Sequence, residues 1–225
     1  MKSLRPYIRI TIHLSLLILA AILWDRLLKI AWSVGPWSGG NSYQDLACLR
    51  ALEILCLLIL WKGERLSILG PKATWCGHIL WGTALGCIGW GAILSLQWGA
   101  LHFFKLDLLN LLQSPVNDTP LITLLLAASV FGPLLEELFF RTFLWQQLGA
   151  NTATILQKCW IAFGMIFAFT ALHIQWDASL MNQLPQIGVW TICASISMVL
   201  MLWRKSILSA WILHGMANAV ILWPK

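Results

Sequence analysis

Residues 121–148 read LITLLLAASVFGPLLEELFFRTFLWQQL, and this stretch constrains the fold more than any other part of the sequence. About 20 apolar residues are enough to cross the hydrocarbon core of a bilayer. The stretch is longer than a simple crossing needs, so we expect its helix to tilt or to break. Gly132-Pro133 is the expected break point, because proline suits the first turn of a new helix.

Other, shorter apolar segments lie on both sides of this stretch, which predicts an all-α, polytopic integral membrane bundle of about seven helices. The run 101–112 mixes apolar and polar residues and predicts an interfacial helix, or an eighth, re-entrant segment. No polar stretch is long enough to form a soluble module, so we expect one membrane-embedded domain over residues 1–225. The predicted spans are Ile8–Ile30, Leu46–Trp61, Trp75–Trp98, Leu121–Leu148, Ile155–Ile174, Ile187–Trp203 and Ile207–Trp223.

The composition supports a membrane protein and argues against nucleic-acid binding. Apolar residues make up 59% of the chain and charged residues only 11%, whereas soluble domains carry about 25% charged residues. The net charge of +6 comes from cations in short segments between apolar runs. This placement suits lipid head groups, so membrane lipids are expected partners and nucleic acid is not. The six cysteines form no CxxC pair, which argues against a disulfide framework or a thiolate metal site.

The positions of the cations also predict the orientation of the chain. Lys2, Arg5 and Arg9 precede the first apolar run, and no small-residue cleavage site follows that run, so we expect a retained first span rather than a signal peptide. Cations are more numerous on the side that holds the N-terminus, which predicts a cytoplasmic N-terminus. The small size and the lack of targeting extensions favour a bacterial inner membrane.

Ionisable side chains inside the fourth span point to a site. An ionisable group at membrane depth costs roughly 2.5 to 3.5 kcal/mol on insertion scales, so it needs an explanation. Glu137 and Arg141 are four residues apart and share a helix face, so they can pair. That ion pair could simply hold helices together, but it leaves Glu136 without a partner. Two adjacent carboxylates raise the cost of ionising both, which is typical of a general acid or base.

Two later spans carry further polar residues that can complete a hydrolytic site. His173 follows Phe169 by four residues, and His214 and Asn218 lie four apart on one helix face. Each residue alone could be an interfacial side chain or a contact between helices. Together, a carboxylate, two imidazoles and an amide provide a base, a second proton carrier and donors for an oxyanion. If the spans are straight, His173 and His214 lie at different depths, so the site requires tilted, broken or offset helices.

The three motifs EExxxR, FxxxH and HxxxN, in this order on separate spans, resemble the CPBP or Abi family of intramembrane proteases, which includes the CAAX prenyl endopeptidases. We expect the catalytic core at residues 119–220. The resemblance implies that Glu136 activates water with help from His173, and that His214 and Asn218 stabilise the oxyanion. Glu137, Arg141 and Phe169 are then supporting residues. Thr142 stands where family members often have glycine.

The resemblance implies a glutamic-type endopeptidase that needs no cofactor and acts on a membrane-associated peptide or protein substrate, lipidated or not. Two alternatives remain open. In the first, Glu136, His173 and His214 bind zinc in a metallopeptidase, although the chain has no HExxH motif. In the second, the chain is a transporter or an immunity or scaffold protein that uses the same residues for proton relay or packing.

Overall fold

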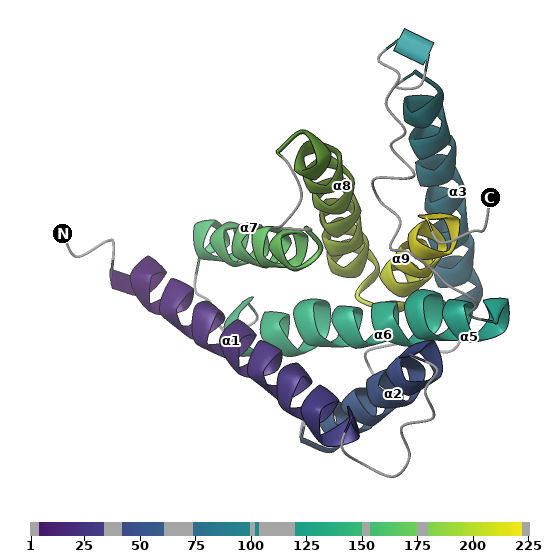
Figure 1. Ribbon diagram of the computed structural model, residues 1–225. Coiled ribbons are helices and arrows are strands. Elements are labelled where there is room, and N and C mark those ends of the chain that lie inside the picture. Colours follow the sequence, from purple (N-terminus) through teal and green to yellow (C-terminus); the bar gives the residue numbers. More distant parts are fainter. Residues whose placement is uncertain are drawn as a thin grey trace.

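The computed structural model describes residues 5–33, 42–60, 74–99, 102–103, 120–149, 154–174 and 180–221. All regular elements in these ranges are helical, which confirms the all-α part of the predicted fold class. Within the described residues, seven helical stretches lie at the positions of the predicted spans, and Figure 1 shows how they are arranged. The elements are α1 (Arg5–Ser33), α2 (Ser42–Leu60), α3 (Trp75–Gly99), α5 (Leu121–Leu125), η4 (Leu126–Phe131), α6 (Gly132–Glu136), η5 (Glu137–Gly149), α7 (Ile155–Leu172), α8 (Leu180–Arg204) and α9 (Leu208–Ile221).

Five helices in the described ranges are long and apolar enough to cross a membrane. The two other helices differ from them in length or charge. Helix α9 has 14 residues, about 21 Å at 1.5 Å per residue, which is shorter than the roughly 30 Å hydrocarbon core. Helix α2 carries Asp45, Arg50 and Glu53 within 19 residues. The five candidate spans are Pro6–Ile30, Trp75–Gly99, Leu121–Gly149, Ile155–Leu172 and Gln183–Arg204.

The long helical stretch formed by α5, η4, α6 and η5 continues through Gly132-Pro133, where the sequence predicted that the helix would tilt or break. Phe131 and Gly132 keep right-handed helical backbone angles. The change at this point is in the hydrogen-bond pattern, because π-helix η4 gives way to the short α-helix α6 with proline in its first turn. Figure 1 shows the stretch as one continuous rod across the molecule. Insertions of π-helix often mark functional sites.

The buried core lies where α7, α8 and α9 pack together and against the long central stretch. Leu144 from η5, Phe169 from α7 and Ala194 from α8 are fully buried. Helix α9 packs on α3 and α8 and also contacts η4, while α2 packs on η4 and α6 from another side (Figure 1). The central stretch is therefore covered by helices from both ends of the sequence.

Many large apolar side chains outside this core are exposed, as expected for surfaces that face lipid. Helix α1 exposes Leu16, Leu23 and Leu27, each by at least half of its surface. Helix α7 likewise exposes Phe163 and Phe167. Most of the predicted interfacial segment 101–112 lies outside the described residues, since only His102 and Phe103 of it are described.

Candidate active site

The two adjacent glutamates lie in different environments at the junction of α6 and η5. Glu136 is the last residue of α6 and Glu137 the first residue of η5. Successive residues on a helix point about 100° apart. The Glu136 side chain consequently remains 28% exposed, while that of Glu137 is completely buried. Of the two side chains only that of Glu136 is partly exposed, and its Oε2 atom is itself buried.

His173 is positioned by the end of helix α7. It is the C-cap residue of that helix, and its Nδ1 lies 2.8 Å from the carbonyl oxygen of Phe169. The imidazole stacks on the Phe169 ring with centroids 4.3 Å apart, and Trp190 of α8 packs against it at 4.5 Å. These contacts direct Nε2 toward Glu136, whose Oε2 lies 3.1 Å away.

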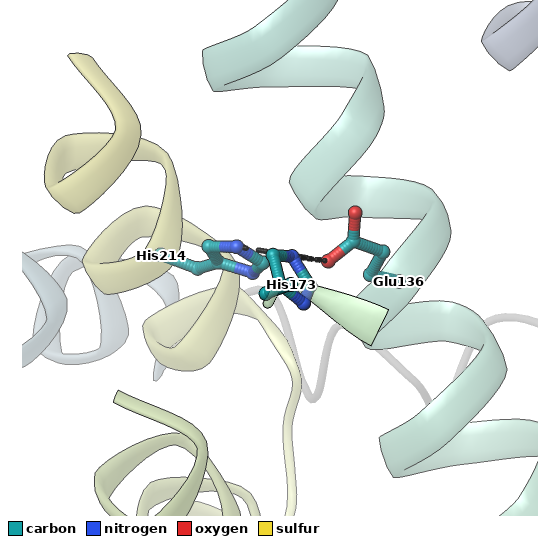
Figure 2. Close-up of side chains that lie close together, drawn as sticks. All are labelled: Glu136, His173 and His214. Carbon is teal, nitrogen blue, oxygen red and sulfur yellow. Dashed lines mark ion pairs between the residues drawn. The ribbon is translucent and has the colours of Figure 1, made fainter. Parts of the chain in front are cut away.

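His214 reaches the same carboxylate from helix α9. Its side chain is completely buried, with Nδ1 3.1 Å from Oε1 of Glu137 and Nε2 3.7 Å from Oε2 of Glu136. Figure 2 shows both imidazoles facing the Glu136 carboxylate. Tertiary packing thus overcomes the difference in depth that straight spans would give His173 and His214, whose ring centroids lie 6.1 Å apart.

The hydrogen bonds of the two histidines determine what Glu136 faces. A carbonyl oxygen can only accept, so Nδ1 of His173 donates its N–H to Phe169. The Glu137 carboxylate likewise accepts from Nδ1 of His214. A neutral imidazole that donates at Nδ1 has a lone pair at Nε2. Both Nε2 atoms and Oε2 of Glu136 then face one another as acceptors, so a proton or a cation is needed between them.

The donor atoms of Glu136, His173 and His214 all lie within 4.8 Å of one another. A divalent ion could bind one carboxylate oxygen and two imidazole nitrogens at this spacing after small side-chain movements. Both imidazoles already donate their other N–H group to a carbonyl or a carboxylate, as metal-binding histidines usually do. The three residues therefore fit a zinc ion as well as a shared proton.

The predicted supporting residues form a buried layer beneath this cluster. Arg141 Nη1 lies 3.4 Å from Oε1 of Glu137, which confirms the predicted pair. Its Nη2 donates to the carbonyl oxygen of Ala194 at 3.3 Å, and its guanidinium carbon lies 4.4 Å from the centre of the Phe169 ring. One cation thereby connects the helices that carry Glu137 and Phe169 to helix α8.

Asn218 does not share the contacts of the other three predicted catalytic residues. Its Nδ2 donates to the carbonyl oxygen of Ala128 in η4, at 2.7 Å. His214 on the same helix faces the two glutamates, whereas the amide of Asn218 faces the backbone of the preceding π-helical turn.

Two residues near the site were not predicted from the sequence. One is Trp190, whose ring packs on the His173 ring and which belongs to none of the three motifs. Arg50 of α2 binds Asp25 and Glu53 at 2.7 and 2.5 Å, and its charge also acts on Glu136. A signal for Arg50 was present, since a cation within an apolar segment is as unusual as a carboxylate there.

Residues 118–220 match the family model described as Type II CAAX prenyl endopeptidase Rce1-like. This segment is Rce1-like. The match confirms the resemblance drawn from the three motifs, and the Rce1-like segment contains all seven predicted site residues. It covers slightly less than half of the chain, so α1, α2 and α3 lie outside it. No curated protein and no solved structure matched the chain.

Proposed function

We propose that the protein is an intramembrane endopeptidase that hydrolyses a peptide bond of a membrane-associated or lipid-anchored substrate. One observation carries the proposal: His173 and His214, on two separate helices, reach Oε2 of Glu136 on a third helix at 3.1 and 3.7 Å, and the Glu136 side chain is partly exposed. The Rce1-like match supports a peptidase of the CAAX type. The apolar helices support a site inside a membrane bundle.

In the proposed mechanism, Glu136 is the general base. It takes a proton from a water molecule whose oxygen attacks the scissile carbonyl carbon. This proton is then held between Glu136 and Nε2 of His173. The negative charge that develops on the carbonyl oxygen is stabilised by His214, which donates from Nε2 when it is protonated between the two glutamates. The shared proton then passes to the amide nitrogen as the carbon–nitrogen bond breaks.

Glu137 and Arg141 have a supporting role in this mechanism. Glu137 fixes the orientation of the His214 ring through Nδ1, and Arg141 balances the charge of Glu137 in a region that excludes water. A carboxylate that orients a catalytic imidazole has the same part in the serine-protease triad. Phe169 sets the position of His173 through both its carbonyl oxygen and its ring.

The expected substrate is lipid-linked, because the family description names CAAX prenyl endopeptidases. A C-terminal CaaX sequence is the signal for prenylation of its cysteine. The site would receive such a peptide within the bilayer, where the prenyl group is already dissolved. A bacterial inner membrane and a cytoplasmic N-terminus remain part of the proposal.

The test compares the wild type with Glu136→Gln, which keeps the size of the side chain but removes the base. Membrane proteomics of the native host would identify processed termini that disappear in the variant, at equal protein level. Asp25→Asn is the matched control, because its carboxylate is 24% exposed but lies on α1. Loss of specific termini only in Glu136→Gln is expected. Unchanged termini in that variant would contradict the peptidase proposal.

A zinc peptidase is the second candidate, because the spacing of the three donor atoms also fits a metal ion. Glu136, His173 and His214 would hold the ion, which would supply Lewis-acid activation of water and carbonyl. The discriminating measurement is metal content of the purified protein together with activity after exhaustive chelation. Full activity without stoichiometric metal would exclude this candidate, whereas loss on chelation that zinc restores would establish it.

A further inference from the structure

Helix α9 presents one face to three consecutive carbonyl groups of η4. The positions 211, 215 and 218 are four and three residues apart, which places them on one side of the helix. Trp211 Nε1 donates to the carbonyl oxygen of Val130 at 3.0 Å, and Asn218 Nδ2 donates to that of Ala128 at 2.7 Å. We call Trp211, Gly215 and Asn218 the α9 clamp.

Gly215 is the central member of the clamp because it leaves room for the backbone of η4. A methyl group on its Cα would collide with the carbonyl oxygen of Ser129. Glycine is the residue that permits such an approach of two helix backbones. The clamp therefore contacts three consecutive carbonyl groups. Trp211 and Asn218 each donate a side-chain hydrogen bond to one of them, and Gly215 lets its backbone pack against the third.

Pro133 explains why the carbonyl of Ala128 needs a donor from another helix. At the end of η4 the N–H of Gly132, its C-cap residue, bonds to the carbonyl of Ala127, five residues earlier. The same pattern would pair Ala128 with Pro133, and the α-helical pattern would pair Ser129 with Pro133. Proline has no N–H, so it leaves a carbonyl unpaired in either pattern. An unpaired carbonyl at membrane depth costs several kcal/mol, and Asn218 supplies the donor that is missing for Ala128.

We propose that Asn218 and Trp211 are positioning residues that fix the register between η4 and α9, and thereby hold Glu136 and Glu137 opposite His214. His214 lies on α9 between the two donors of the clamp, while the glutamates follow Pro133 by three and four residues. A shift of η4 along α9 would change the 3.1 Å contact between His214 and Glu137. In this role Asn218 acts through Ala128 rather than on the oxyanion.

The catalytic consequence of the clamp rests on the proposed peptidase function, but its geometry can be tested separately. The variant Asn218→Ala removes the donor, and Pro133→Ala restores a backbone N–H to the same turn. Two readouts are needed: the thermal unfolding midpoint in detergent, and the imidazole ¹⁵N resonances of His214 in protein labelled at its five histidines.

We expect Asn218→Ala to lower the midpoint by about 5 °C, since it leaves a buried acceptor unpaired, and to shift the His214 resonances. In the Pro133→Ala background, Asn218→Ala should change the midpoint and the His214 resonances by less than half of what it changes them in the wild type. Trp211→Phe keeps the ring but lacks the donor and should shift the same resonances. Gly215→Ala should destabilise the protein strongly, whereas its control Gly188→Ala should not, because nothing lies within 4 Å of that position.

The proposal is overturned if Asn218→Ala abolishes cleavage while the His214 resonances and the midpoint stay unchanged, because Asn218 would then act on the reacting atoms. Failure of Pro133→Ala to recover either readout would also overturn it. Failure of the peptidase proposal gives a different result: Glu136→Gln would retain processing, while the coupling between positions 133 and 218 would persist in both readouts.

Discussion

Removal of the Arg141 charge should destabilise this protein far more than removal of an exposed charge. The Arg141 side chain is 2% exposed and balances Glu137, which is completely buried. The substitution Arg141→Met keeps much of the apolar volume but leaves the Glu137 carboxylate next to His214 without its cation. Breaking a buried pair by removing one partner costs about 3 to 5 kcal/mol. The lost hydrogen bond to Ala194 and the lost contact with the Phe169 ring act in the same direction.

For a chain of this length, about 4 kcal/mol corresponds to a decrease of roughly 8 to 16 °C in the thermal unfolding midpoint. The assay is circular dichroism at 222 nm during heating of the purified protein in detergent. Lys29→Met is the matched control, because Lys29 forms an ion pair with Asp25 at 2.8 Å but is 43% exposed. An exposed pair contributes at most about 1 kcal/mol, so the control should lose no more than about 4 °C.

The double variant Arg141→Met/Glu137→Gln separates charge from packing. It removes the buried anion together with its cation, so it should recover a large part of the lost stability. Equal decreases in Arg141→Met and Lys29→Met would refute the assignment of Glu137 and Arg141 as a buried supporting pair. If the double variant recovers no stability, the loss in Arg141→Met comes from the missing packing against Phe169 instead of the unpaired charge.

Two further predictions concern helices on either side of the site. Arg50→Gln should lower the unfolding midpoint by several degrees, because it leaves the buried Glu53 carboxylate unpaired. The double variant Arg50→Gln/Glu53→Gln should restore part of the lost stability in the same melting assay. Thr154→Ala removes the capping box with Gln157 at the start of α7 and should cost about 1 kcal/mol. Thr154→Ser keeps the cap and should melt close to the wild type.

Local spacing in the sequence was enough to predict contacts within one helix. Glu137 and Arg141 are four residues apart, and the structure pairs them because helical geometry fixes that distance. The all-helical fold followed from the length and the apolar character of the segments. The number of membrane crossings did not follow, because α9 is short for a span and α2 contains three charged residues.

Contacts between helices depend on packing that no short motif specifies. The order of the motifs suggested that Glu136, His173 and His214 act together, but straight spans would place the two imidazoles at different depths. The meeting of both rings at Glu136 results from the way α7 and α9 pack around the central stretch. The bond from Asn218 to Ala128 was harder still to predict, since it depends on the π-helical hydrogen-bond pattern of η4.

The two neighbouring glutamates show how one peptide segment can provide both a reactive and a fixed carboxylate. Glu137 points into the bundle, where Arg141 and His214 both contact its Oε1. Its charge is balanced there without water. Glu136 points about 100° away, its side chain is partly exposed, and its Oε2 faces two imidazole nitrogens. A substitution at Glu137 should therefore affect stability and the orientation of His214 first, while Glu136→Gln should affect chemistry with little change in melting. A large loss of stability in Glu136→Gln would mean that both carboxylates are architectural, and the distinction between base and support would fail.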